Sequence, residues 1–410
     1  MMLSTVYTTL VWTISFLFTC YAGYYFAVAL FGLRKEDPIP EAAPTRRFAV
    51  VVAARNEEAV IGHLVESLLA QDYPRELFDV IVAPNNCTDH TAQAAAQAGA
   101  TLFHCTAPVR SKGEVLTQVF DHLLTQPYDG FCVFDADNLV DPGFLRAMNN
   151  ALAKGARLAQ GYRDSKNPHD TPISGCYSIY YWMINRFYSR ARGKLGLSAI
   201  VNGSGFMVSA SLLREMGGWH TYTMTEDIEF TTQCILRGER AMWVPQAVTY
   251  DEQPLTFAQS WKQRKRWSTG MIQGTALYLG PLVRRALTRK DPAAADHAVF
   301  FLMPVMTVLL VISALAGGIH WLAASPALLF PRTQVFFQLF FSLSTAILSA
   351  FAVVVLEKKL HPAIWKGIFF YWVYILSWIP INLLCLVKRT TTWEVIPHTR
   401  SLSFSRLDGR

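Results

Sequence analysis

The segment Phe131-Cys-Val-Phe-Asp-Ala-Asp-Asn138 decides the fold that we predict. Its first four residues are apolar, which is typical of a buried strand, and the strand ends at two carboxylates, Asp135 and Asp137. In an open α/β sheet, ligands bind just beyond the carboxyl ends of the strands. Paired carboxylates at that edge suit Mg²⁺ or Mn²⁺ bridging to the diphosphate of a nucleotide. The same residues could also form an ordinary turn, because Asp is a favoured turn residue.

The composition indicates a soluble domain joined to several membrane helices. Of the 410 residues, 52% are hydrophobic and only 16% are charged, and the mean hydropathy is positive. The net charge of +7 does not require nucleic acid, because Lys and Arg cluster beside hydrophobic segments, as expected next to an anionic cytoplasmic leaflet. The 7 Cys residues lack metal-ligand spacing and are odd in number, which is typical of reduced thiols in the cytosol.

The chain begins with an apolar segment that we interpret as a retained membrane anchor. The stretch from Val6 to Leu33 is longer than the ~20 residues that a spanning helix needs. A signal peptide would have a basic start and a shorter apolar core. Arg34 and Lys35 follow at once, and the positive-inside rule then places the next domain in the cytosol. We predict a transmembrane helix at residues 1–34 and a proline-containing linker at residues 35–46.

Residues 47–254 show the alternation of strands and helices that is typical of an α/β domain. Apolar runs at 48–54 and 78–83 precede polar turns and amphipathic segments, as does the run at 131–135. This order predicts a parallel sheet covered by helices on both faces. Each strand delivers polar residues to the same edge of the sheet, and we predict a nucleotide site there.

Four motifs in this order resemble those of membrane-embedded family 2 glycosyltransferases, such as cellulose, hyaluronan and chitin synthases. They are Val52-Ala-Ala-Arg-Asn-Glu-Glu58, Asp135-Ala-Asp137, Thr225-Glu-Asp227 and Gln263-Arg-Lys-Arg-Trp267. The resemblance covers about residues 46–275. It implies a GT-A fold, which is a Rossmann-like parallel or mixed sheet, in a cytosolic domain that binds a UDP-sugar.

The resemblance assigns several residues to the donor. Asp135 and Asp137 match the Asp-x-Asp pair that holds Mn²⁺ or Mg²⁺ and the nucleotide. Lys112 matches a lysine beside the nucleotide, although a solvated loop lysine would look the same. Where the family usually presents an Asp to uracil, this chain has Asn85, whose amide can still bond a base edge. That departure leaves the identity of the base open.

The resemblance also assigns residues to catalysis and to the acceptor. Asp227 occupies the position of the catalytic base, which removes the acceptor proton while the diphosphate leaves from the opposite face. Glu226 beside it would lie near the acceptor. These two acids could instead cap the following helix. Gly203 and Ser204 resemble a small-residue loop that lets the acceptor sugar approach, or they form a plain turn.

Residues 255–292 are predicted to form amphipathic helices on the bilayer surface. Within them Gln263, Arg266 and Trp267 match the Gln-x-x-Arg-Trp motif, whose arginine contacts the diphosphate and whose tryptophan stacks beneath the acceptor sugar. We expect Arg264 and Lys265 to face lipid. The aromatic run at 176–188 is more typical of packing than of a sugar-stacking platform.

Residues 293–388 contain three apolar stretches, at about 297–321, 334–356 and 363–387, each long enough to span. Three crossings would leave the C-terminal tail at 389–410 outside, whereas its basic residues favour the cytosol. The third stretch could therefore be re-entrant or interfacial. The tail segment Trp393–Arg400 resembles a motif that some of these synthases place near the site.

We therefore expect a multi-pass enzyme of the plasma or inner membrane that is metal-dependent and inverting. It would transfer sugar from a UDP-sugar to a growing polysaccharide, with export through its helices. Because three or four spans make a thin channel, a homo-oligomer or a partner would be needed. Two alternatives stay open: a non-processive enzyme that glycosylates a membrane lipid, and a transporter or scaffold with an inactive domain. The intact Asp135, Asp137 and Asp227 count against the second.

Overall fold

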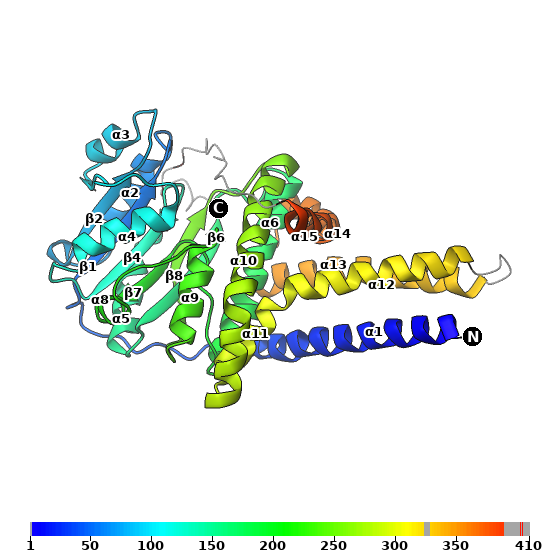
Figure 1. Ribbon diagram of the computed structural model, residues 1–410. Helices are drawn as coiled ribbons and strands as arrows, with labels where there is room; N and C mark the ends of the chain where they lie inside the picture. The colour runs from blue at the N-terminus through cyan, green and yellow to red at the C-terminus, as the bar shows by residue number, and fades with distance from the viewer. Residues whose placement is uncertain (1, 324–328, 389–401, 403, 405–410) are drawn as a thin grey trace.

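The computed structural model describes residues 2–323, 329–388, 402 and 404 (Figure 1). An α/β domain occupies one end of the molecule, and the helices α1 (Met2–Ala29), α12 (Met303–Ala323) and α13 (Leu329–Leu356) project from its far side.

The α/β domain is built on one mixed sheet of 8 strands in the order β3-β2-β1-β4-β7-β6-β8-β5. Strand β1 pairs in parallel with β2 and β4, whereas β7 is antiparallel to both β4 and β6. The predicted parallel or mixed sheet is therefore confirmed. The strands are β1 (Phe48–Ala54), β2 (Phe78–Pro84), β3 (Thr101–Leu102), β4 (Gly130–Asp135), β5 (Leu139–Val140), β6 (Leu158–Ser165), β7 (Phe206–Ser209) and β8 (Ala241–Asp251).

Helices cover both faces of the sheet. Successive side chains of a strand point to opposite faces, and here both faces are apolar. Val50 and Val52 of β1 are buried in one apolar cluster, and Val51 is buried in the other. The first cluster lies under α2 (Ile61–Leu69), α3 (Thr91–Gln97) and α5 (Phe144–Ala153). The second lies under α4 (Lys112–Leu123), α8 (Ala210–Met216) and α9 (Glu226–Ile235).

A register shift between β6 and β8 sets the polar edge of the sheet. The shift falls between Gly161 and Tyr162. A Cβ atom on Gly161 would lie 2.3 Å from the carbonyl oxygen of Ala247, so only glycine fits this close approach. Beyond the shift the strands pair again, and they carry Arg163 and Asp251 to the end of the sheet.

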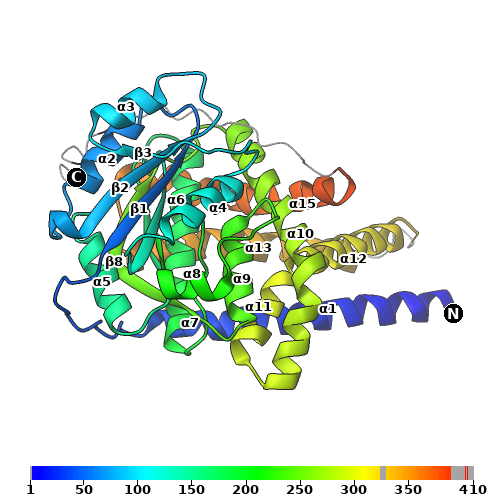
Figure 2. The ribbon, with the colours of Figure 1, turned by 60° about the vertical axis from the view of Figure 1, so that its left-hand side comes forward.

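A second group of helices lies between the sheet and the projecting helices (Figures 1 and 2). The long helix α10 crosses this layer, and its first turn is closed by a capping box of Thr256 and Gln259. The layer consists of α6 (Pro172–Met183), the π-helical turn η3 (Ile184–Arg190), α7 (Ala191–Lys194), α10 (Phe257–Arg289) and α11 (Pro292–Phe301). The short 3₁₀ turns are η1 (Leu30–Leu33), η2 (Arg75–Leu77) and η4 (Pro362–Ile364).

The remaining helices are α1 (Met2–Ala29), α12 (Met303–Ala323), α13 (Leu329–Leu356), α14 (Trp365–Leu376) and α15 (Trp378–Val387). In the described chain, Thr9–Leu33 and Pro362–Val387 are long and apolar enough to cross a membrane, and the bent pair Pro292–Phe301 and Met303–Ala316 would be a third candidate. The three predicted apolar stretches thus correspond to α11 with α12, to α13, and to α14 with α15. Whether each of them crosses stays a prediction.

Helices α14 and α15 do not follow the direction of the other apolar helices. Whereas α1, α12 and α13 run alongside one another, α14 and α15 run across them and lie against α6 and α10 (Figures 1 and 2). At the crossing of α6 and α14, a Cβ atom on Gly367 would lie 2.9 Å from the backbone of Gly175. This backbone contact holds α14 close against α6.

The prediction that Arg264 faces lipid is wrong. Its side chain is fully buried between α10 and the α14–α15 pair. The guanidinium donates to the carbonyl oxygen of Tyr374 at 2.8 Å and to the hydroxyl of Ser377 at 2.7 Å. Helical periodicity shows which residues share a face, but here a second helix covers the face that was expected to meet lipid.

The predicted tail at 389–410, with its segment Trp393–Arg400, lies outside the described residues except for Leu402 and Phe404. The ring of Phe404 lies 6.1 Å from that of Tyr250, near the end of β8.

Candidate active site

One cavity of about 1350 Å³ contains most of the predicted site residues. Its volume exceeds the roughly 300–1,000 Å³ that is usual for a pocket holding one small ligand, so it has room for more than one substrate. The predicted residues that line it are Lys112, Asp135, Asp137, Gly203, Glu226, Asp227, Gln263, Arg266 and Trp267.

Two predicted site residues, Asn85 and Ser204, are not among the described residues that line this cavity. The amide of Asn85 donates to the carbonyl oxygen of Ala54 at 3.0 Å and so ties the ends of β1 and β2 together. Ser204 is fully buried, and its hydroxyl accepts from the backbone N–H of Asp135 at 3.0 Å. Each of these side chains has a partner within the protein, and the predicted roles of Asn85 and Ser204 in ligand binding stay predictions.

Lys112 lies at the start of α4 and links Asp135 to the loop that carries Gly203. Its Nζ donates to Asp135 Oδ1 at 2.5 Å and to the carbonyl oxygen of Gly203 at 2.6 Å. Burial lowers the pKa of Lys112, but the carboxylates of Asp135 and Glu226 outweigh burial and raise the pKa above its usual value. Lys112 is thus a buried, charged lysine and not the solvated one of the alternative reading.

Asp135 and Asp137 fit a divalent cation that also binds substrate. Burial raises the pKa of Asp135, but Lys112 and Arg163 outweigh burial and keep the pKa below its usual value. Asp137 Oδ2 accepts from the backbone N–H of Glu252 at 3.1 Å. Within the described residues, no group of three or more His, Cys, Asp and Glu side chains could hold a metal alone. Two carboxylates would fill two coordination positions of a metal ion and leave the others to phosphate oxygens and water, which is the usual pattern for Mg²⁺.

Asp227 lies in the first turn of α9, across Gly203 from Asp135. A Cβ atom on Gly203 would lie 3.5 Å from Asp227 Oδ2 and 3.6 Å from Asp135 Oδ2, so these two carboxylates flank the same glycine. Burial, with the nearby charge of Glu226, raises the pKa of Asp227 to about 7. A carboxylate with a pKa near neutral is well suited to accept a proton.

Three aromatic rings line the cavity beyond Asp227. Tyr180, Trp267 and Trp378 lie with ring centroids 6.1, 6.2 and 6.4 Å apart, and Trp267 is tilted by 19° to each of the other two. They come from α6, α10 and α15. Tyr180 belongs to the run for which packing was predicted, and it both packs and faces the cavity. Aromatic faces of this kind suit the apolar face of a sugar ring.

The same cavity is also lined by the projecting helices α1 and α12 and by α11, α14 and α15. Its lining there combines aromatic, apolar and small polar side chains from α1, α11, α12, α14 and α15, which are Tyr21, Tyr25, Phe300, Met303, Thr307, Ile375, Ile379 and Asn382. The site of the paired carboxylates is therefore connected to the helices that could enter a membrane.

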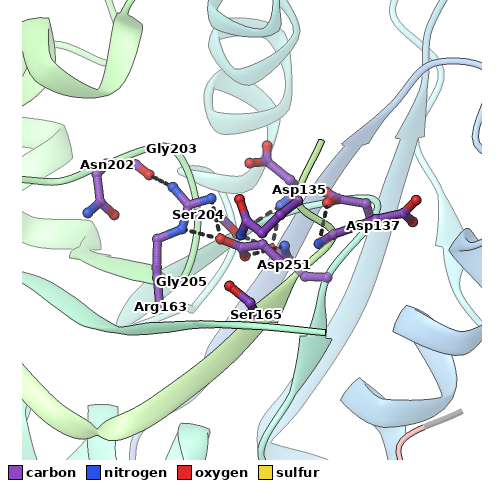
Figure 3. Close-up of polar contacts among 12 residues, drawn as sticks. Asp135, Asp137, Arg163, Ser165, Asn202, Gly203, Ser204, Gly205 and Asp251 are labelled. Carbon is purple, nitrogen blue, oxygen red and sulfur yellow. Dashed lines mark hydrogen bonds and ion pairs between the residues drawn. The ribbon is translucent and has the colours of Figure 1, made fainter. Parts of the chain in front are cut away.

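Among the cavity residues that sequence reasoning missed are Asn202, Arg163 and Asp251 (Figure 3). Arg163 donates through Nε and Nη2 to Asp251 Oδ2 at 2.6 and 2.5 Å. Burial raises the pKa of Asp251 to about 7, although Arg163 opposes this. The available signal is position, since Arg163 lies near the end of β6 and Asp251 ends β8, as Asp135 ends β4.

The chain is similar in sequence to several curated glycosyltransferases and synthases. The chain is 26% identical over 238 residues to the probable glycosyltransferase YdaM of Bacillus subtilis, covering 55% of each protein. It is 26% identical over 269 residues to a beta-monoglucosyldiacylglycerol synthase of Synechocystis, covering 60% of this chain and 54% of the relative. It is 25% identical over 224 residues to a poly-beta-1,6-N-acetyl-D-glucosamine synthase of Staphylococcus aureus, covering 54% and 53%. The chain thus spans about half the length of the curated relatives it matches.

A solved structure shares the architecture. The mannosyltransferase PcManGT of Pyrobaculum calidifontis, in complex with GDP-Man and Mn²⁺, superimposes with a TM-score of 0.63 at 20% identity, covering 91% of this chain and 99% of that one. The likeness shows the fold, and the predicted GT-A fold is confirmed. Residues 44–270, more than half of the chain, match the family described as glycosyltransferase like family 2. The chain therefore belongs to glycosyltransferase family 2.

Proposed function

We propose that the protein transfers a sugar from a nucleoside-diphosphate sugar, expected to be a UDP-sugar, to a carbohydrate acceptor at the cytosolic face of the membrane. One observation carries this proposal: Asp135 and Asp137, Asp227 and Trp267 all line a single cavity that reaches the projecting helices. The residues proposed to hold the donor, to act as the base and to bind the acceptor thus share one cavity, which supports a direct transfer.

The donor would lie at the sheet edge. Lys112 and Arg266 provide positive charge for its phosphates, and the buried Gln263 amide oxygen lacks a hydrogen-bond partner among the described residues, which leaves it available to a ligand. When bound by Asp135 and Asp137, Mn²⁺ or Mg²⁺ supplies charge neutralisation for the leaving diphosphate.

Asp227 would act as the general base. Its carboxylate removes the proton from the acceptor hydroxyl while that oxygen attacks the anomeric carbon, and the diphosphate leaves from the opposite face with inversion. Glu226 lines the cavity beside it and helps to raise the pKa of Asp227.

Extension of a polysaccharide is the acceptor reaction that we favour, because the rings of Tyr180, Trp267 and Trp378 offer a face wide enough for sugar rings. A membrane-lipid acceptor is the second candidate. It is favoured by the apolar end of the cavity at Phe300, Met303 and Ile379, where a lipid chain could lie. Relatives named for a glycolipid and for a polysaccharide are both among the similar proteins.

The arrangement of helices supports a topology in which α1, α12 and α13 cross the membrane. The pair α14–α15 would lie in the interface, with one side on α6 and α10 and exposed apolar residues such as Phe369 and Phe370 towards lipid. This topology returns Lys388 to the cytosolic side and reconciles the apolar third stretch with the basic tail. Three crossings make a narrow path, so export of a polymer would need a homo-oligomer or a partner.

Sizing the product tests the proposal. Purified protein in lipid vesicles is incubated with Mn²⁺ and labelled UDP-Glc, UDP-GlcNAc, UDP-Gal or UDP-GlcA. A labelled polymer is the expected result. A glycolipid carrying a single sugar would establish the second candidate and end the first. Absence of transfer from every donor to any acceptor would contradict both, and would revive the scaffold alternative.

A further inference from the structure

The loop between Val201 and Phe206 is held by a closed ring of side-chain hydrogen bonds (Figure 3). Arg163 of β6 donates through Nη1 to the carbonyl oxygen of Asn202 and through Nε and Nη2 to Asp251 at the end of β8. Asp251 Oδ1 accepts from Asn138 Nδ2 at 2.7 Å. Asn138 Oδ1 in turn accepts from the hydroxyl of Ser204, which returns the ring to the loop.

The ring joins three parts of the site that are far apart in the sequence. Asn138 ties it to the turn of the paired carboxylates, because Asn138 Oδ1 also accepts from the backbone N–H of Asp135 at 3.1 Å. The face of Tyr181 lies 4.5 Å from the Arg163 guanidinium and prevents it from swinging away. Arg163 and Asp251 are both buried, so the fork between them is shielded from water and its geometry is fixed.

The residue that this ring positions is Asn202. Its backbone N–H donates to Gln160 Oε1 at 3.1 Å, and its carbonyl oxygen accepts from Arg163, so its backbone is fixed on both sides. Its side-chain amide differs: both the nitrogen and the oxygen are buried without a hydrogen-bond partner among the described residues, yet the residue lines the cavity. Buried amides are normally paired, and an exception in a cavity points to a ligand that supplies the missing bonds.

The position of Asn202 suggests which ligand this is. The next residue, Gly203, lies between the carboxylates of Asp135 and Asp227, where donor and acceptor must meet. An amide can donate to and accept from the same hydroxyl-bearing ring, whereas it offers no charge to a phosphate. We propose that the Asn202 amide binds hydroxyl groups of a sugar at the transfer point, and that Arg163 and Asp251 are positioning residues that hold it there.

This inference rests on the proposed sugar transfer, and a double-mutant cycle tests it separately. Asn202→Ala should lower kcat/KM by roughly 10- to 100-fold, because a sugar hydroxyl loses its buried partner. KM measured against donor and against acceptor then shows which sugar the amide binds. Asp251→Asn should cause a loss of similar size. The double variant should be no worse than the poorer single variant, because both remove the same interaction.

The control is Glu357→Gln, which breaks the partly buried ion pair that Glu357 forms with Arg186 at 2.5 Å, outside the cavity. Its kcat/KM per folded enzyme should match that of the wild type, and its effect should add to that of Asn202→Ala. If Asp251→Asn fails to fold, Ser204→Ala removes one bond of the ring and should show the same non-additivity on a smaller scale.

Two results would overturn the inference while leaving sugar transfer intact. The first is an active wild type whose Asn202→Ala variant keeps kcat/KM within about twofold. The second is a double variant whose loss of kcat/KM equals the product of the losses caused by Asp251→Asn and Asn202→Ala alone. An inactive wild type would instead contradict the proposed function itself.

Discussion

Asp227 is the residue whose environment gives the clearest prediction, because burial and Glu226 together raise its pKa to about 7. A general base works only when it is deprotonated, so turnover should rise with pH from about 6 to 8 and reach half of its maximum near 7. The measurement is kcat at saturating donor over this range. An ordinary aspartate would give a flat profile here, and such a profile would show that Asp227 is not the base.

At this scale the sequence predicts the residues that stand in motifs and misses those that meet only in space. Asp135, Asp137, Asp227 and Trp267 could be named in advance because their types and order are informative. Arg163 and Asp251 are separated by 88 positions and come together only after β6 and β8 pair across a register shift. Asn85 has a side chain that could bind a base, but its amide donates to the carbonyl oxygen of Ala54, and this contact cannot be deduced from the residue type.

Among the helices, α15 contributes directly to the predicted acceptor platform through Trp378. Replacing Trp378 with Ala should raise KM for the acceptor by roughly 3- to 10-fold, since one aromatic contact is worth about 0.5–1.5 kcal/mol. KM for the donor should not change. Trp372→Ala is the matched control, because Trp372 is on the neighbouring helix α14, is 37% exposed and does not line the cavity. Equal acceptor KM values for wild type and Trp378→Ala would contradict the platform.

The crossing of α6 and α14 depends on Gly175 and Gly367. A methyl group at Gly367 would meet the backbone of Gly175 at 2.9 Å, and forcing such a contact costs about 1–3 kcal/mol. Gly367→Ala should therefore lower the melting temperature in detergent by several degrees. Gly62→Ala in α2 has nothing within 4 Å of the new methyl group and should not lower it. A Gly367→Ala protein as stable as the wild type would show that the crossing is not tight.

The strands and helices of the α/β domain can be predicted from the sequence. The spacing of apolar residues differs between strands and helices, and this spacing is a local property of the chain. The direction of α14 and α15 does not. Length and hydropathy are the same for a helix that crosses a bilayer and for one that lies on it, and the difference arises from packing against α6 and α10. For the same reason the lipid-facing prediction for Arg264 is wrong, because the α14–α15 pair covers this side chain.

For the whole molecule, the proposed topology has the α/β domain and Lys388 on the same side of the membrane. Green fluorescent protein fused to the C-terminal end of the chain should fluoresce, as it does only in the cytosol, and alkaline phosphatase at that point should be inactive. A fusion after Ala323, at the outer end of α12, serves as a reference for the other orientation. Active phosphatase at the C-terminal end would mean that α14 and α15 cross the membrane.

The proposed reaction uses the entire cavity: a donor held at Asp135 and Asp137 reacts with an acceptor that Asp227 deprotonates. The most direct test compares wild type and Asp227→Asn for two quantities, affinity for the nucleotide sugar in the presence of Mn²⁺ and rate of sugar transfer in lipid vesicles. We expect equal affinity and a rate reduced by about 10²- to 10⁴-fold in the variant. Transfer by Asp227→Asn at the wild-type rate would contradict it.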